Sequence, residues 1–282
     1  MPKIDAHHHC WRYTAEDLPW IDDAMRPLRR NFYPADLAPL LAQMGIDGTV
    51  VVEARPVVEE TLQLLEHSQR HRFIRGVVGW VPLVDPKVGR LLEQLAEDPG
   101  LKGVRHALQP EADEFMADPA FNAGLQVLAR LGLSFDLVIK ARQLPAATAL
   151  VDRHPGLAFV LDHIAKPVVA GPPPAEWRRQ LAELARRPNV TCKFSGVVTE
   201  APGFQWTPGM LWPYFDVVLE CFGAERIMFG SDWPVCLLAT TYSDWFRFVA
   251  GCVTGLSAHD RDEILGGTAT RVYRLTPRPS AI

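Results

Sequence analysis

The sequence predicts one closed barrel of eight parallel β-strands alternating with helices, and three observations lead to this fold class. Eight short apolar runs are spread over 282 residues. Segments with helical periodicity lie between most of them, which is the alternation expected of βα units around a buried parallel sheet. The length suits one α/β barrel of the (β/α)8 TIM type, whereas an open doubly wound sheet usually needs fewer strands for one ligand site.

Each predicted strand is a run of β-branched or other apolar residues. Continuous runs of this kind are typical of a parallel sheet that is covered on both faces. In chain order the runs are Lys3–His9, Gly48–Ala54, Phe73–Val81, Leu101–Leu108, Ser134–Ile139, Ala158–Ile164, Val190–Gly196 and Ile227–Pro234.

The helices are predicted from apolar residues at the spacing of one helix face. The clearest set falls at i, i+3, i+4, i+7 and i+8, and it consists of Val88, Leu91, Leu92, Leu95 and Ala96. Two further sets repeat this theme: Phe121 with Leu125 and Leu128, and Trp177 with Leu181 and Leu184.

Helix start signals agree with these periods. Asp118-Pro119 supplies an N-cap residue followed by proline at the first helical position, and Pro173-Pro174 precedes the helix of Trp177. Ser257-x-x-Asp260 has the pattern of a capping box.

The chain shows no domain linker. Its richest proline stretch, Gly171–Pro174, is too short to separate domains and is typical of a loop entering a helix. Thr199–Pro213 is the longest segment without a regular pattern, and we expect an irregular lid or specificity loop there. Residues 1–275 are therefore expected to form a single domain, and residues 276–282 a C-terminal tail.

The composition excludes several classes of protein. With 48% hydrophobic and 22% charged residues, the chain has enough apolar material for a large core. Its 29 basic and 33 acidic residues give a net charge of −4 without long runs of one sign, so we expect no nucleic-acid partner. No run approaches the roughly 18 apolar residues of a membrane span, and the start of the chain lacks a leader pattern. We expect a cytoplasmic protein, monomeric or homo-oligomeric, without a membrane partner.

The first predicted strand ends in a histidine pair. In a barrel of this kind the catalytic groups project from the C-terminal ends of the strands. The run Asp5-Ala6-His7-His8-His9 places His7 and His9 on one face and His8 on the other, because side chains alternate along a strand. A pair of histidines so spaced can chelate one cation.

Four other strand ends carry polar residues. Taken singly, each has a plain structural explanation: a buried hydrogen-bonded histidine, a solvated turn aspartate or a surface salt bridge. Taken together, they would gather around one rim. They are Arg105-His106 in the fourth run, Asp162-His163 with the following Lys166 in the sixth, Lys193 and Ser195 in the seventh, and Asp232 in the eighth.

The combination of these motifs resembles a known family. In order they are Asp5-x-His7-x-His9, Leu161-Asp162-His163-x-x-Lys166-Pro167, Cys192-Lys193-x-Ser195-Gly196 and Gly230-Ser231-Asp232-Trp233-Pro234. They resemble the amidohydrolase superfamily, and within it the branch of sugar-lactone and dicarboxylate-lactone hydrolases that includes L-fuconolactonase and L-rhamnonolactonase. The resemblance runs from Lys3 to about Leu275.

This resemblance implies a distorted barrel with the active site at its mouth. It assigns four residues to the centre as potential metal ligands: His7, His9, His163 and Asp232. Binuclear members of the superfamily carry a bridging carboxylated lysine on the fourth strand, and a further histidine on the strand that follows the one matching the strand of His163. This chain offers Arg105-His106 and then Lys193 and Ser195 in those places, so at most one divalent cation is expected, zinc or another. Some relatives hydrolyse without metal, so the need for it stays open.

The expected reaction is hydrolysis of an aldonolactone, a small sugar-derived lactone. Asp232 would act as general base on water, while His163, Arg105 or a cation polarises the lactone carbonyl. Contacts to the sugar are expected from Trp11, His106, Lys166 and Ser195, and further candidates to line the pocket are Trp20, Glu53, Trp80 and Trp206.

Two alternative functions remain open at this point. A metal-dependent non-oxidative decarboxylase of an aromatic or unsaturated acid would use similar residues around a tightly held metal. A catalytically silent barrel that binds a sugar acid or a metal is the alternative from another class, because a fold does not imply an activity.

Overall fold

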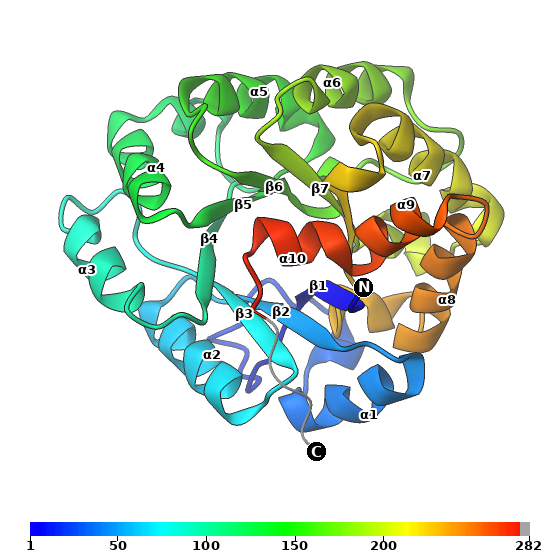
Figure 1. Cartoon of the computed structure of the whole chain (residues 1–282), viewed down its shortest axis with the longest axis horizontal. Coiled ribbons are helices and arrows are strands. Elements are labelled where there is room, and N and C mark those ends of the chain that lie inside the picture. The colour runs from blue at the N-terminus through cyan, green and yellow to red at the C-terminus, as the bar shows by residue number, and fades with distance from the viewer. Residues whose placement is uncertain (277–282) are drawn as a thin grey trace.

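Eight parallel strands surround a common centre in the computed structural model, which describes residues 1–276. Neighbours in the sheet follow chain order throughout, and helices surround the strands (Figure 1). The strands are β1 Ile4–His8, β2 Gly48–Val52, β3 Ile74–Gly79, β4 Leu101–Ala107, β5 Ser134–Val138, β6 Phe159–Leu161, β7 Val190–Phe194 and β8 Ile227–Phe229. The predicted TIM-type barrel is confirmed, with one strand inside each predicted run.

The first and last strands approach each other at their C-terminal ends. The His9 N–H donates to the Trp233 carbonyl at 2.6 Å, and the Asp232 N–H donates to the His7 carbonyl at 2.8 Å. The residues that bring the two edges of the sheet together thus include three of the four predicted ligands.

Helices pack around this sheet and bury its outer face, and the last helix lies across one end of the barrel (Figure 1). They are α1 Pro34–Met44, α2 Val58–Arg70, α3 Val88–Leu95, α4 Pro119–Leu131, α5 Leu144–Arg153, α6 Ala175–Ala185, α7 Pro208–Phe222, α8 Tyr242–Cys252, α9 Ala258–Asp262 and α10 Thr268–Val272. The predicted helix starts agree with this arrangement. The Asp118 carboxylate accepts from two N–H groups in the first turn of α4, and the Ser257 hydroxyl accepts from the Asp260 N–H at the start of α9.

The prediction for Thr199–Pro213 was partly wrong. Two short 3-10 turns, Val197–Glu200 and Pro202–Phe204, occupy its first half. Helix α7 already begins at Pro208 and continues through Pro213. The prolines misled the interpretation: Pro208 stands at the first helical position, where its fixed φ suits a helix and its missing N–H costs nothing.

Two apolar cores hold the barrel together. The larger core lies between the strands and the surrounding helices. The smaller core lies on the inner side of the strands and is built from short side chains such as Val50, Val78 and Val160. Helix α10 crosses one end of the barrel near the N-terminus of the chain (Figure 1), and Tyr273, which follows it, belongs to the inner core. The opposite end is therefore the end that remains for a site.

Two sequence predictions concern the limits of the fold. No helix within residues 1–276 has the length and apolar character needed to cross a membrane. Of the tail expected at residues 276–282, the structure describes Thr276, and residues 277–282 lie outside the described residues.

Candidate active site at the C-terminal end of the barrel

Four buried side chains from three separate strand ends converge at the mouth of the barrel. The Nε2 atoms of His7 and His9 lie 3.2 Å apart, and Asp232 Oδ1 lies 3.4 Å from Nε2 of His9 and 3.7 Å from Nε2 of His7. His163 Nε2 approaches the same carboxylate oxygen at 4.0 Å. The structure thus brings together the four residues that the sequence motifs placed at the centre.

His9 and His163 are each held by a contact to Nδ1, the ring nitrogen that does not face Asp232. The His9 Nδ1 lies 2.9 Å from the Val52 carbonyl, and because a carbonyl can only accept, this nitrogen carries the proton. The Nε2 lone pair of His9 therefore faces the cluster. His163 Nδ1 lies 2.9 Å from the Ser195 hydroxyl. Such contacts fix the orientation of metal-binding histidines.

The backbone takes left-handed conformations at two of these residues. Four consecutive residues after β6 have positive φ: His163 at 53°, Ile164 at 50°, Ala165 at 63° and Lys166 at 47°. Asp232 has φ 56°. Such angles are costly for residues other than glycine and gather at functional sites. They also end β6 and β8 early, so the predicted strand ends at Ile164 and Pro234 were wrong.

Gly196 allows these two side chains to approach each other. Its φ is +63°, and a Cβ atom built on it would lie 2.4 Å from His163 Nδ1 and 2.8 Å from Asp232 Oδ2. Both distances are below any ordinary contact, so the position requires glycine for space as well as for backbone conformation.

The protonation states of the cluster suit a cation. Burial would raise the pKa of Asp232, but His163, His9 and His7 together bring it below its ordinary value, so the carboxylate is ionised. Burial lowers the pKa of His163 to about 4 and that of His7 well below its ordinary value. Neutral imidazoles beside a carboxylate are the forms in which these groups bind metal.

The donor set therefore fits a divalent metal ion such as zinc. The atoms offered by His7, His9 and Asp232 lie within 4.8 Å of one another, and Nε2 of His163 lies 4.0 Å from Oδ1 of Asp232. Three imidazole nitrogens and one carboxylate oxygen are ligands that zinc accepts.

A network of buried ion pairs lies directly beneath these ligands. Arg105 donates from Nε to Glu53 Oε1 at 2.6 Å, and its Nη1 lies 3.3 Å from Asp162 Oδ2 and 3.4 Å from His7 Nε2. The cation of Arg105 thus adjoins the cluster but is already paired with two carboxylates.

Lys193 extends the network toward the centre of the barrel. Its Nζ lies 2.5 Å from Asp136 Oδ2, 3.0 Å from Asp162 Oδ1 and 3.2 Å from His7 Nδ1. Tyr273 donates its hydroxyl to the same oxygen of Asp136 at 2.7 Å. Sequence reasoning singled out Asp162 as a polar residue at a strand end but gave it no partner, and it missed Asp136, although a carboxylate inside an apolar strand was a signal for it.

The expected sugar-binding residues fall into different places. Trp11 is 4% exposed, with its ring centroid 6.3 Å from that of His9. Its indole packs edge-on against Trp20 and Phe32. Trp20 and Trp206 donate their ring N–H groups to carbonyls, of Ala54 and Ala239 respectively.

His106 is not brought to the cluster. Its ring stacks on that of Phe115 at 5.2 Å, and its Nε2 lies 3.5 Å from Glu111. The reason is the alternation of side chains along β4: Arg105 faces the barrel interior, so the next residue faces the helices.

Lys166 and Glu200 form a charged pair beside the left-handed turn that follows β6. The sequence analysis singled out Lys166 but missed Glu200. Lys166 Nζ lies 3.8 Å from Glu200 Oε1, with both side chains about four-fifths buried. Burial raises the pKa of Glu200, Lys166 and Lys140 lower it, and Asp232 raises it further. Glu200 follows the seventh strand by six residues, in a segment with no pattern that would have singled it out.

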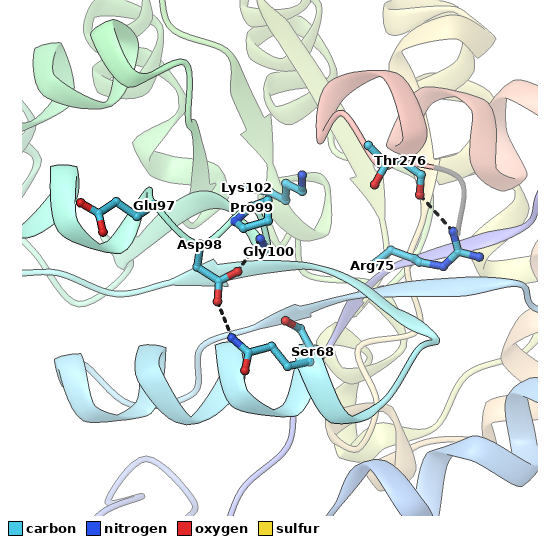
Figure 2. Close-up of a pocket in the computed structure, with 9 residues that line it drawn as sticks. Ser68, Arg75, Glu97, Asp98, Pro99, Gly100, Lys102 and Thr276 are labelled. Carbon is cyan, nitrogen blue, oxygen red and sulfur yellow. Dashed lines mark hydrogen bonds between the residues drawn. The ribbon is translucent and has the colours of Figure 1, made fainter. Parts of the chain in front are cut away.

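A cavity of about 400 Å³ lies at the other end of the barrel and contains none of the predicted site residues. Arg75 and Lys102, near the beginnings of β3 and β4, contribute to its wall together with Asp98 (Figure 2). Since catalytic groups of such barrels stand at the C-terminal ends of the strands, the histidine cluster is the candidate active site.

Comparison with known proteins places this chain in a family. The chain belongs to the amidohydrolase family, because residues 4–275 match the model of the family described as Amidohydrolase. The family expected from the four motifs is thus confirmed.

Individual relatives match over nearly the full length. The chain is 38% identical over 285 residues to the L-fucono-1,5-lactonase of Burkholderia ambifaria, covering 99% of this chain and 97% of the relative. It is 40% identical over 295 residues to the L-fucono-1,5-lactonase of Burkholderia multivorans, with the same coverage. A crystal structure of an amidohydrolase from Burkholderia multivorans with bound zinc has 40% identity and a TM-score of 0.94, covering 98% of this chain and 100% of that one.

Proposed function

We propose that this protein is a sugar lactone hydrolase that opens an aldonolactone such as L-fucono-1,5-lactone to the sugar acid. The observation that carries the proposal is the ionised Asp232 carboxylate between three histidines at the mouth of the barrel. The full-length similarity to two L-fucono-1,5-lactonases supports the choice of substrate class. That similarity also favours this function over the decarboxylase and the silent binding protein.

Asp232 is the proposed general base. It takes a proton from a water molecule while the water oxygen bonds to the lactone carbonyl carbon. When the ring C–O bond breaks, the same carboxyl group returns the proton to the departing ring oxygen. The products are a carboxylic acid and a hydroxyl group on one chain, so the atoms of one water molecule account for the whole change. A positioned proton-transfer group typically contributes about 10² to 10⁴-fold.

Negative charge on the carbonyl oxygen must be stabilised during this step. His163 and Arg105 are the proposed donors, since both adjoin the carboxylate cluster. A divalent cation held by His7, His9, His163 and Asp232 would supply further polarisation of the carbonyl and would acidify the attacking water.

The sugar hydroxyl groups require donors and acceptors at the rim. We assign this task to the pair Lys166 and Glu200, which offers an ammonium group and a carboxylate 3.8 Å apart. Trp11 and Ser195 stand beside His9 and His163 respectively and are proposed contacts to the ring. His106 is not included, because its ring stacks on Phe115.

The test is proton release from a panel of aldonolactones, followed with a pH indicator. The wild-type protein is expected to release acid from at least one lactone, and Asp232→Asn should lower kcat by about 10² to 10⁴-fold with unchanged circular dichroism. Asp98→Asn, at the other end of the barrel, is the matched control and should keep wild-type activity.

Removal of metal by a chelator distinguishes a mechanism that uses a metal ion from one that uses side chains alone. Activity that is lost on chelation and restored by zinc assigns the metal a role, whereas activity that survives chelation assigns catalysis to the side chains alone. Absence of acid release from every lactone would contradict the proposed function.

A further inference from the structure

Lys193 is a fully buried lysine whose ammonium group is surrounded by atoms of the kind that bind metal. It is 0% exposed, as are the side chains of Asp136 and Asp162. Burial of an ammonium group is unfavourable unless the group is closely paired. Here Nζ lies 2.5 Å and 3.0 Å from two carboxylate oxygens and 3.2 Å from His7 Nδ1.

These three neighbours form a ready coordination set. Two carboxylate oxygens and an imidazole nitrogen bind divalent cations at about 2.0 to 2.2 Å, which is about 0.3 to 1.2 Å closer than they stand to the ammonium nitrogen. Oδ1 of Asp162 lies 3.0 Å from Lys193 Nζ and 3.4 Å from His7 Nδ1, and neither contact has hydrogen-bond geometry within residues 1–276. The oxygen therefore interacts with the ammonium group by charge rather than as the acceptor of a directed hydrogen bond.

His7 stands between two cation positions. Its Nδ1 lies 3.2 Å from Lys193 Nζ and 3.4 Å from Asp162 Oδ1. Its Nε2 lies 3.2 Å from His9 Nε2 and 3.7 Å from Asp232 Oδ1, with Arg105 Nη1 at 3.4 Å. The donor atoms of His7, Asp162 and His163 also lie within 4.8 Å of one another, so the geometry alone offers a second set of potential ligands. Lys193 already fills the Nδ1 side.

The charges of the network also favour a single divalent ion. Within residues 1–276, the ion-pair network and the histidine cluster together hold four buried carboxylates and two buried cations, Arg105 and Lys193, which leaves an excess of two negative charges. One divalent ion balances this excess, and a second would reverse it. The four carboxylates are Glu53, Asp136, Asp162 and Asp232.

We propose that Lys193 occupies a second cation position and thereby limits the site to one divalent ion, bound on the Nε2 side of His7 with His9 and Asp232. The ammonium group neutralises Asp136 and Asp162 and keeps them from acting as ligands. This role concerns the number and place of metal ions and does not depend on which lactone is hydrolysed.

The test counts zinc per chain by elemental analysis after saturation with zinc and removal of the excess. We expect one zinc in the wild-type protein and two in Lys193→Ala, because the variant leaves a vacant position between Asp136 and Asp162. His7 would then bridge the two ions as an imidazolate and release its ring proton to solvent. Lys193→Arg keeps the charge and should bind one. Lys102→Ala is the matched control, since Lys102 lies on strand β4 at the other end of the barrel (Figure 2), and it should also bind one.

Removal of a buried charge can prevent folding, so a second measurement uses the wild-type protein only. Anomalous diffraction at the zinc edge should show one peak, between His9 and Asp232, and none beside Asp136. A wild-type protein with zinc beside Asp136, or a folded Lys193→Ala that still binds a single zinc, would overturn the proposal.

Discussion

The substitution Gly196→Ala tests whether close approach at one glycine sets the geometry of the active site. The new methyl group would lie 2.4 Å from His163 Nδ1, whereas ordinary contacts begin near 3.4 Å. The imidazole must therefore move by about 1 Å, and a displacement of that size can cost about 10²-fold in rate. A second contact, 2.8 Å from Asp232 Oδ2, pushes the carboxylate as well.

The same substitution carries a backbone cost that must be separated from the effect on the site. An alanine at φ +63° costs roughly 1 to 2 kcal/mol relative to glycine. Gly45 is the matched control: its φ is +65°, it ends helix α1, and the nearest atom to an added Cβ is the flexible end of Lys3 at 3.9 Å.

The assay compares kcat/KM for the best lactone with the free energy of unfolding in denaturant. Gly45→Ala should lose stability by the backbone cost alone, and Gly196→Ala should lose at least as much because of its added contacts. Only Gly196→Ala should lose about 10²-fold in kcat/KM. If Gly196→Ala retains more than about a third of wild-type kcat/KM, the glycine does not position the catalytic pair and the reasoning fails.

Three further outcomes are expected. Burial and the neighbouring Glu53 raise the pKa of Glu60 from 4.5 to about 7, so between these pH values the folded protein holds a proton that the unfolded chain releases. The free energy of unfolding should therefore fall as the pH rises from about 4.5 to 7, by up to ~1.4 kcal/mol per pH unit. Glu60→Gln should flatten this part of the profile of stability against pH. Asp118→Ala removes the cap of α4 and should cost about 1 kcal/mol, seen as a Tm lower by roughly 2 to 4 °C; an unchanged Tm would rule out this contribution. Ser195→Ala frees His163 Nδ1 and should weaken zinc binding by about 10 to 100-fold in a competition titration; equal affinity would show that the hydroxyl does not orient the ring.

The fold could be predicted because it depends on patterns that repeat along the chain. Every predicted strand run contains a strand, since alternation of apolar runs with helical periods has few other solutions. The errors lie where local conformation is set by the site. The ends of β6 and β8 depend on left-handed backbone at His163 and Asp232, and no residue type at these positions announces it.

The candidate site could be predicted only as far as residue type and strand position reach. His7, His9 and Asp232 stand at strand ends, where a polar residue after an apolar run attracts notice. The partners of Arg105 and Lys193 depend on which strands face each other across the barrel. Which residues become partners is decided when the barrel closes, because the paired residues are far apart in the sequence.

Closure of the barrel at its first and last strands has a consequence for how the molecule opens. Within the described residues, the backbone bonds of His9 and Asp232 join these two edges beside the very side chains that would bind a ligand. A metal or substrate held there bridges residues more than 200 positions apart, so it acts as a removable crosslink across the seam. Amide protons along β1 and β8 should then exchange faster than those of β3 to β5 when the site is empty, and slow down together when it is filled.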